Sequence, residues 1–443
     1  MASTYLTRTG STGDRKTLTI SYWLKRGNIT TSSSQGVLNA GILSNGDNHS
    51  FCGFQFSTDT AIIQTTTGGS NVMSLQSNAL FRDTSAWYHF VWKVDTTQAT
   101  ESNRITLYVN GVQHSLTGTY PSQNQDTWIN YADTHTVGTR FTNYFDGSLA
   151  HFHLIDGTAY DASTFGETDS TTGIWKPKTA PSVTYGTNGF FLKFENSGSM
   201  GTDSSGNANN LTVNGTMTQT IDTPANVFAT LNPLDNDSAT TFSNGNCKAV
   251  TDNSLRKPFY STLAVSSGKY YWEIKMIDID SSFFLAGISG SYSSINDVLG
   301  YELYDYGYRK FNGAVRNNDS DTSYGSSFAD GDIIGVGLDL DNNKLYFAKN
   351  GTWENSADPS AGTGGFSITD ASDTVKGSYT PSGSDFSTGS GATVEFNFGN
   401  GYFGTTAVSS AQNPDDGIGI FEYDVPTGYR ALCTKSINAE EYS

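Results

Sequence analysis

Two dipeptides that favour tight turns recur along the whole 443-residue chain. Asn-Gly occurs eight times and Asp-Gly four times, and both suit type I′ hairpins because the two central residues of such a turn need positive φ angles. Between these turns lie stretches in which apolar and polar residues alternate with a period of two, as in 104–112 and 333–341. This succession of turn signals and alternating stretches predicts many short antiparallel strands.

The alternation also predicts which side of each strand is buried. In the first stretch, Ile105, Leu107 and Val109 share one face before the Asn110-Gly111 turn. In the second stretch, one face is entirely aliphatic: Ile334, Val336, Leu338 and Leu340. Five larger aromatic residues lie inside equally strong strand patterns and are predicted core residues: Trp23, Trp87, Trp92, Tyr271 and Trp272.

Composition supports an all-β fold. Charged residues make up only 15% of the chain and aromatic residues 13%, which argues against helical bundles and supplies enough aromatic side chains for hydrophobic cores. We expect two antiparallel β-sandwich (jelly-roll) domains joined by a polar connector, with a short C-terminal tail. The predicted boundaries are 1–195, a Ser/Gly/Asn-rich connector at 196–240, a second sandwich at 241–400 and a tail at 401–443. A further polar stretch, 369–391, is expected to form one long surface loop.

Charge and targeting features exclude several classes of function. The chain carries 25 Lys and Arg against 43 Asp and Glu, a net charge of −18, and its basic residues never exceed adjacent pairs. This argues against nucleic acid as a partner. The absence of any apolar run of about 18 residues argues against membrane insertion, and the start of the chain lacks an apolar signal core. The three widely spaced cysteines encode neither a disulfide framework nor a zinc cluster.

Several segments show a resemblance to known domain families. The first half, from Tyr5 to about Phe194, resembles a laminin G-like domain of the concanavalin A-like class, through 85–95 (SAWYHFVWKVD), 105–112 (ITLYVNGV) and 144–157 (YFDGSLAHFHLIDG). The later half resembles a SPRY domain, through 268–274 (GKYYWEI), 285–289 (LAGIS) and 324–351. Both resemblances imply β-sandwiches.

A narrower set of segments resembles virion structural proteins of marine tailed phages. The set comprises 15–26 (RKTLTISYWLKR), 165–178 (FGETDSTTGIWKPK), 222–234 (DTPANVFATLNPL) and the ending at 394–400 and 426–434. This resemblance implies a virion protein that assembles in the host cytoplasm, is released by lysis, and has other virion proteins and a host-surface glycan or receptor as partners. By analogy with phage appendages it also implies a homo-oligomer, a trimer. The lack of a separate anchoring domain before the first sandwich argues against a long tail fibre.

The common catalytic signatures are missing. Glycan-cleaving enzymes on the concanavalin A-like scaffold need two or three carboxylates close together on one strand, whereas the ten glutamates here are dispersed and only Glu440 and Glu441 are adjacent. Serine-hydrolase, zinc-protease and phosphate-loop motifs do not occur either. We therefore expect a non-enzymatic protein, with a polysaccharide depolymerase built from dispersed carboxylates as an alternative.

Metal-binding patterns are weak. Residues 203–210 (DSSGNANN) offer closely spaced oxygen ligands and resemble a segment of laminin G-like chains, some of which bind calcium. An Asx-rich turn is the preferred interpretation, with calcium as the alternative. His151 and His153 alternate on a strand without a third ligand, so we expect packing positions there.

Aromatic and arginine residues beside turns are the candidate ligand-binding residues, because aromatic faces stack on sugar rings and both residue types are frequent in interaction hot spots. The candidates are Trp128, Tyr131, Arg140, Tyr144, Tyr304, Tyr306, Tyr308, Arg309 and Trp353. For the run 304–309, ligand binding and strand packing weigh about equally, whereas Trp353 is expected at the surface. We expect these loops to recognise host-surface glycan or protein, with a ligand-free capsid decoration or tail adaptor as the alternative.

Overall fold

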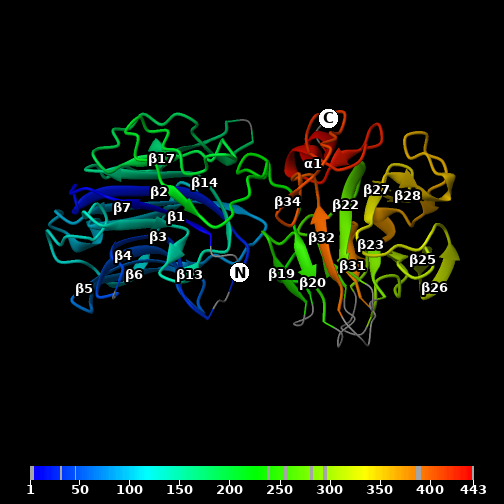
Figure 1. The fold of residues 1–443 in the computed structure, drawn as a ribbon, viewed down its shortest axis with the longest axis horizontal. Coiled ribbons are helices and arrows are strands. Elements are labelled where there is room, and N and C mark those ends of the chain that lie inside the picture. Colours follow the sequence, from blue (N-terminus) through cyan, green and yellow to red (C-terminus); the bar gives the residue numbers. More distant parts are fainter. Residues whose placement is uncertain are drawn as a thin grey trace. The chain divides into compact units, whose positions relative to one another are not determined.

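The computed structural model describes residues 4–29, 32–44, 46–170, 172–236, 240–252, 258–279, 283–292, 297–385 and 391–441. The chain divides into two compact units, Met1–Gln219 with Thr223–Ala225, and Thr220–Asp222 with Asn226–Ser443. We call them the N-terminal and the C-terminal unit. Both consist of β-sheets (Figure 1) whose strands pair antiparallel except for the parallel pair β22–β35, and the α-helix in the described ranges is the short α1, Thr434–Glu441. The all-β prediction is therefore confirmed.

The N-terminal unit contains two large sheets. The eight-stranded sheet has the order β10-β6-β5-β4-β3-β11-β1-β18, with bounds Leu116–Thr119, Ser70–Leu80, Thr60–Thr67, Asn48–Phe54, Gln35–Ile42, Thr134–Val137, Tyr5–Thr9 and Thr212–Asn214. The six-stranded sheet has the order β17-β14-β2-β7-β8-β9, with bounds Phe190–Leu192, Gly147–Asp156, Thr17–Arg26, Trp87–Asp95, Ile105–Val109 and Val112–His114. Shorter elements are the pairs β12–β13 (Thr139–Arg140, Asn143–Tyr144) and β15–β16 (Gly166–Thr168, Trp175–Pro177), and the 3-10 turns Glu101–Asn103 and Ala162–Thr164.

The core of this unit lies between its two sheets. Ile105, Leu107 and Val109 point into it, as their alternation predicts, together with side chains of both sheets such as Trp92 and Ile63. The opposite face of the six-stranded sheet is also covered. Residues of 160–165 and 175–185 pack there in a second cluster, so outward-facing residues of β7 and β14 are buried as well.

The C-terminal unit is a second sandwich. Its larger sheet has the order β19-β20-β32-β22-β27-β28-β29, with bounds Thr241–Ser243, Lys248–Val250, Thr393–Asn397, Lys269–Asp278, Ile333–Asp339, Lys344–Lys349 and Thr352–Trp353. β30 (Phe366–Ser367) pairs with β28, and β35 (Arg430–Ala431) pairs with β22. The smaller sheet has the order β21-β31-β23-β24-β25-β26, with bounds Phe259–Tyr260, Thr380–Ser384, Leu285–Ser289, Asp305–Arg309, Ala314–Asn317 and Ser320–Ser323. The remaining elements are β33–β34 (Tyr402–Phe403, Thr406–Ala407) and the 3-10 turns Glu354–Ser356 and Ala371–Asp373.

The predicted strand faces and turns are confirmed in this unit too. The aliphatic face of β27 lies in the core, where it meets side chains of β22, β23 and β24. Both Asn110-Gly111 and Asn350-Gly351 join paired strands with positive φ angles, 48° and 81° in the first turn and 50° and 79° in the second. The five aromatic residues predicted as core residues are all buried.

Three polar segments fold differently from the sequence prediction. In the expected connector 196–240, Leu211 is buried and β18 pairs with β1, while Phe228 and Leu231 enter cores of the C-terminal unit. The expected surface loop 369–391 contains β31, which pairs with β21 and β23 inside the smaller sheet. The expected tail 401–443 includes β35, which lies beside β22. In each case a few apolar side chains and backbone pairing bury a segment whose composition is polar.

Limited proteolysis tests where the two units separate. Val213 and Ile221 are 37% and 38% exposed, whereas Met200 and Leu211 are buried. We expect the first cleavage by thermolysin near Ile221, giving two stable fragments that mass spectrometry can identify. A first cut between residues 200 and 211 would contradict the packing of that segment on the N-terminal unit.

Candidate functional site

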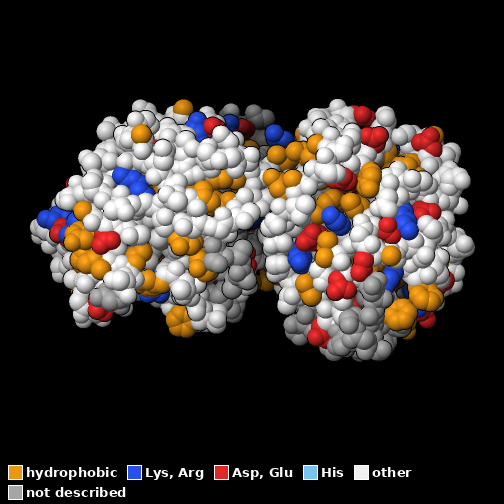
Figure 2. Space-filling view, viewed as in Figure 1, with side chains coloured by type: hydrophobic (Ala, Val, Ile, Leu, Met, Phe, Trp, Pro, Cys, Tyr) orange, Lys and Arg blue, Asp and Glu red, His pale blue; other side chains and the backbone are white. Residues whose placement is uncertain are grey.

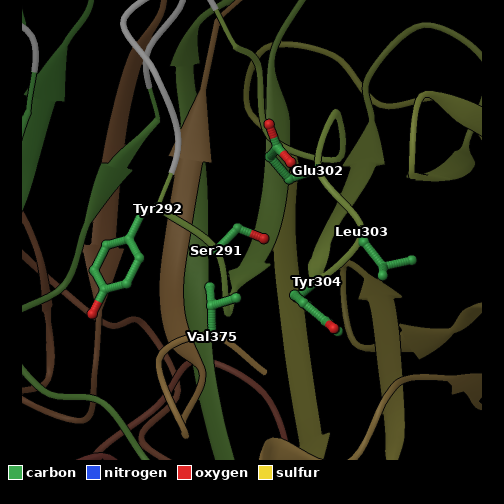
Figure 3. A pocket seen from close by; sticks show the side chains of 6 residues that line it. All are labelled: Ser291, Tyr292, Glu302, Leu303, Tyr304 and Val375. Carbon is green, nitrogen blue, oxygen red and sulfur yellow. The ribbon is translucent and has the colours of Figure 1, made fainter. Parts of the chain in front are cut away.

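The C-terminal unit has an open hollow of about 260 Å³ where its smaller sheet ends (Figure 3). It lies beyond the end of β23 and before the start of β24. The residues that line it come from three segments of the chain: Ser291, Tyr292, Glu302, Leu303, Tyr304 and Val375.

Gly290 brings these three segments together. Its N–H donates to the Tyr304 carbonyl at 2.8 Å, and its own carbonyl accepts from the Lys376 N–H at 3.3 Å. A Cβ atom at position 290 would lie only 2.9 Å from Thr374 Cγ2, closer than packed carbon atoms approach. The hollow therefore depends on a residue without a side chain at the end of β23.

Exposed apolar side chains form the walls of the hollow. Tyr292 is 76% exposed, Val375 58% and Leu303 49%, and the neighbouring Tyr301 is 46% exposed. Single exposed apolar residues are ordinary, but several around one concavity are typical of a binding surface. The wall residues are thus available to an apolar group of a partner.

Two polar groups in the hollow can form hydrogen bonds with a partner. The Ser291 hydroxyl is buried and has no hydrogen-bond partner among the described residues, and in Figure 3 it points toward the side where Leu303 and Tyr304 lie. The half-buried Glu302 places a carboxylate at the rim. A partner that supplies a hydrogen-bond donor beside an apolar group would satisfy both.

The candidates in the run 304–309 divide between the hollow and the core. Tyr304 lines the hollow, whereas Tyr306 and Tyr308 are 3% and 0% exposed and pack in the core. The proposal that Tyr306 and Tyr308 bind ligand is therefore corrected, because both side chains point inward from β24. Arg309 lies outside the core and forms a salt bridge with Asp321.

Trp353 packs at the edge of the larger sheet. Its ring lies 6.2 Å from that of Tyr271 and 6.3 Å from that of Tyr346, edge-on in both cases. It is half-buried against a cluster formed with the C-terminal segment. Trp353 therefore lies partly at the surface, as expected, but its ring also packs against other aromatic residues.

The N-terminal unit brings two of its predicted residues together. The rings of Trp128 and Tyr131 meet edge-on at 4.8 Å, and the Arg15 guanidinium lies 4.9 and 5.0 Å from their centroids. Arg15 also pairs with Asp126 at 3.4 Å. Arg140 and Tyr144 lie on the β12–β13 hairpin instead, where the Arg140 guanidinium lies over the Phe51 ring and the Tyr144 ring packs at a tilt against Tyr5.

The sequence did not reveal most of the hollow. Ser291, Tyr292, Glu302 and Leu303 lie in a segment without a period-two pattern, and Val375 lies more than seventy residues further along. The one signal in the sequence was the group of aromatic residues around Tyr301 and Tyr304. Only the fold places Val375 beside them.

Glu273 is a fully buried carboxylate with a raised pKa, and its hydrogen-bond partners point to a structural role. Its side chain is 0% exposed and accepts hydrogen bonds from the Glu422 and Tyr423 N–H groups at 2.9 Å each. The Tyr271 hydroxyl and Asn397 Nδ2 donate to it at 3.1 and 3.2 Å. Burial raises the pKa of Glu273 to about 7. All four donors belong to the protein, so this carboxylate anchors the C-terminal segment to β22.

The segment predicted as the alternative calcium site forms a hydrogen-bonded turn. The Asp203 carboxylate accepts from the N–H groups of Phe191, Ser205 and Asn209 and from the Ser205 hydroxyl. Within the described ranges, no three His, Cys, Asp or Glu side chains lie close enough to hold a metal ion. The donors around Asp203 favour the Asx-turn interpretation.

Surface charge and helix length bear on two further classes of partner. On the face shown in Figure 2, Lys and Arg side chains occur singly or in small groups, with acidic side chains among them. Across the part of the chain that the structure describes, no helix has the length and hydropathy needed to cross a membrane.

Comparison with known families assigns both units. Residues 269–401 match the family model described as SPRY domain, and residues 2–164 match that of the concanavalin A-like lectin/glucanases superfamily. The chain joins a laminin G-like domain to a SPRY domain. The hollow belongs to the SPRY domain, whereas the arginine-aromatic contacts of Arg15 and Arg140 belong to the laminin G-like domain.

Relatives of known sequence or structure match parts of the chain. Ran-binding protein 9 of Danio rerio is 30% identical over 91 residues, which cover 20% of this chain and 15% of that protein. The Drosophila melanogaster homologue of Ran-binding proteins 9/10 is 28% identical over 88 residues, 19% of this chain and 9% of that protein. The chain thus spans about 15% or less of the length of these relatives. The SPRY domain of human HERC1 is 19% identical, with a TM-score of 0.30, and the match covers 38% of this chain and 96% of that domain.

Proposed function

We propose that this chain is a non-enzymatic binding protein whose SPRY domain holds a protein partner at the hollow. The observation that carries the proposal is the group of exposed apolar side chains, Tyr292, Leu303 and Val375, around the buried Ser291 hydroxyl, which has no hydrogen-bond partner among the residues that the structure describes. Such a combination of an apolar wall with a few directional polar groups suits a peptide segment or loop. The SPRY domain as a family mediates protein interactions, which supports a partner of this class.

Selection of peptides from a random library tests this site and does not require the natural partner. We expect peptides selected on the full chain to lose binding to the Leu303→Asp variant by roughly tenfold or more, because a charge then replaces an apolar wall. Val112→Asp is the matched control, since Val112 is 64% exposed in the other unit. Equal binding to wild type and Leu303→Asp would place the peptide site elsewhere.

The biological setting that we propose is the surface of a tailed-phage virion. The segments at 15–26, 165–178 and 222–234 support it through their resemblance to phage structural proteins. In this setting the partners are other virion proteins and a host-surface glycan or receptor, and the protein is a homo-oligomer, a trimer by analogy. Cryo-EM of the parent particle tests the proposal: density at a distal tail appendage supports host attachment, whereas many copies buried in the capsid lattice mean a structural decoration. A particle without the chain contradicts a virion role.

A further inference from the structure

The rim of the hollow carries a negative charge that no described side chain balances. Glu302 is half-buried among the residues that line the hollow, and its carboxylate forms neither a salt bridge nor a hydrogen bond with a described residue. Other carboxylates of the C-terminal unit do have cationic partners: Asp321 pairs with Arg316 at 3.2 Å, and Asp332 pairs with Lys349 at 3.2 Å. The Glu302 carboxylate is therefore available to a cation from outside the chain.

The cation on the adjoining segment contacts the other wall of the hollow. Lys376 Nζ lies 4.3 Å from the centroid of the Tyr260 ring and 5.5 Å from that of the Tyr292 ring. In Figure 3, Tyr292 and Glu302 stand on opposite sides of Ser291. The positive charge of Lys376 thus lies at the Tyr292 wall, and the Glu302 side of the hollow keeps its negative charge.

The backbone that carries Glu302 and Leu303 is fixed by the turn between β25 and β26. The Asn318 N–H donates to the Glu302 carbonyl at 3.3 Å. The Asn317 amide donates to the Leu303 carbonyl at 2.7 Å and to the Asp305 carbonyl at 2.9 Å. The rim is therefore ordered without a partner, so binding does not have to supply the free energy of ordering it.

Ser291 adds a second acceptor to the same hollow. The residue is 4% exposed, its hydroxyl has no hydrogen-bond partner among the described residues, and its backbone N–H donates to Ser289 Oγ at 3.3 Å. In Figure 3 the hydroxyl lies between the side chains of Glu302 and Tyr304. Polar groups are rarely left unpaired in a protein interior. A ligand that offers hydrogen-bond donors to both Ser291 and Glu302 would pair the two groups at once.

The charge and the acceptors together select one kind of side chain. An apolar group alone would leave Ser291 and Glu302 covered but unpaired, which is unfavourable. A carboxylate would be repelled, because residues 226–443 contain more than twice as many acidic as basic residues. An ammonium group is a compact point charge, whereas a guanidinium is planar, presents five N–H donors and stacks on aromatic rings. An arginine side chain therefore suits the hollow best.

We infer that the hollow binds a segment of a partner protein in which an arginine lies beside an apolar residue. The inference rests on the function proposed above and defines the chemistry of the partner. The guanidinium donates two parallel hydrogen bonds to the Glu302 carboxylate and a further N–H to the Ser291 hydroxyl. The neighbouring apolar residue packs on Leu303 and Val375, which are 49% and 58% exposed without a partner.

A double-mutant cycle between the full chain and a synthetic peptide tests the arginine. The probe is a library peptide whose binding is lost in Leu303→Asp, and we expect it to contain an arginine next to an apolar residue. Exchange of that arginine for citrulline keeps the shape without the charge and should weaken binding roughly tenfold or more. Glu302→Gln should weaken the arginine peptide by a similar factor and change the affinity of the citrulline peptide less than about twofold.

Asp424→Asn is the matched control, because it removes the same charge from an exposed side chain on the C-terminal segment, and it should bind both peptides like wild type. The thermal midpoint of Glu302→Gln should equal that of wild type, since this carboxylate loses no partner. Selected peptides without arginine, equal affinity of arginine and lysine peptides, or independent losses in the cycle would overturn the inference but leave peptide binding at the hollow intact. Peptides that bind Leu303→Asp unchanged would overturn the proposed function and this inference together.

Discussion

Acidification from pH 7 to pH 5 is expected to unfold the N-terminal unit while the C-terminal unit stays folded. All six histidines lie before residue 196. Burial lowers the pKa of His49 and His135 to about 4 and that of His89 to about 3. Burial also lowers the pKa of His153 well below its usual value of 6.5. Each ring is therefore neutral in the folded state.

Proton linkage determines whether acid stabilises or destabilises the N-terminal unit. The unfolded chain binds protons at these rings near pH 6.5, whereas the folded unit does not, so the stabilisation is fully present above pH 6.5 and is lost as the pH falls toward 4. Each ring contributes about 1.4 kcal/mol for each pH unit in this window. Four such rings together remove several kcal/mol by pH 5, comparable with the whole stability of a typical domain, about 5–15 kcal/mol.

Hydrogen bonds show why these rings stay neutral. His89 Nδ1 accepts from Trp175 Nε1 at 2.9 Å, and His135 Nε2 accepts from the Asn130 N–H at 3.0 Å. A doubly protonated ring would place two donors against each other at these contacts. Protonation therefore requires Trp175 and the 127–131 loop to come away from the sheets.

The C-terminal unit responds in the opposite direction. Its Glu273 has a pKa raised to about 7, so its contribution to stability is fully present below the unfolded value of about 4.5 and is lost as the pH rises toward 7. Calorimetric unfolding at pH 7, 6 and 5 should show two transitions that move apart. His135→Gln keeps an acceptor for Asn130 without the titrating ring and should reduce the acid shift of the first transition. Two transitions that shift together would contradict this account.

Replacing Glu273 with alanine is expected to release the C-terminal segment and strongly destabilise the SPRY-containing unit. Four donors lose their acceptor at once, among them the N–H groups of Glu422 and Tyr423. Loss of one partner from a buried charged or hydrogen-bonded group costs about 3–5 kcal/mol. The segment also covers Tyr271 and Phe228, which would become exposed.

Urea unfolding monitored by fluorescence measures this effect, with two comparison variants. Asp424→Ala lies on the same segment with an exposed side chain, so its free energy of unfolding should change by less than about 0.5 kcal/mol. Glu273→Gln keeps one acceptor but turns an amide group toward the backbone donors, so we expect an intermediate loss. Equal midpoints for Glu273→Ala and Asp424→Ala would show that the buried carboxylate does not hold the segment.

Strand faces were predictable because period-two alternation records burial directly, as in β8 and β27. The structure of polar segments was not predictable, since amino-acid composition says little about which backbone segments pair as strands. Thr380–Ser384 reads as a loop, yet backbone hydrogen bonds to β21 and β23 make it an interior strand, and Gly383 admits the rings of Phe259 and Phe284 above it. The same limit applies to the expected connector and tail.

The candidate sites show a second limit of sequence reasoning. A period of two places Tyr304, Tyr306 and Tyr308 on the same side of a strand, and that side could be either exposed or packed. Only the fold shows that Tyr306 and Tyr308 lie in the core. The hollow requires Gly290 to join segments that are far apart in sequence. Arg140 was identified as a candidate from its residue type, but its position over the Phe51 ring depends on the three-dimensional structure.

The position of β35 beside β22 has a consequence for biosynthesis. The N-terminal unit has all its strands once residue 214 has left the ribosome, so it can fold while the rest is still being translated. The C-terminal unit cannot finish folding before its last residues are translated, because β22 pairs with β35 and Glu273 accepts a hydrogen bond from Glu422. Until then one face of its larger sheet, with Tyr271, is open to solvent. Chaperones, or neighbouring nascent chains, therefore have most opportunity to bind while the SPRY domain is still incomplete on the ribosome.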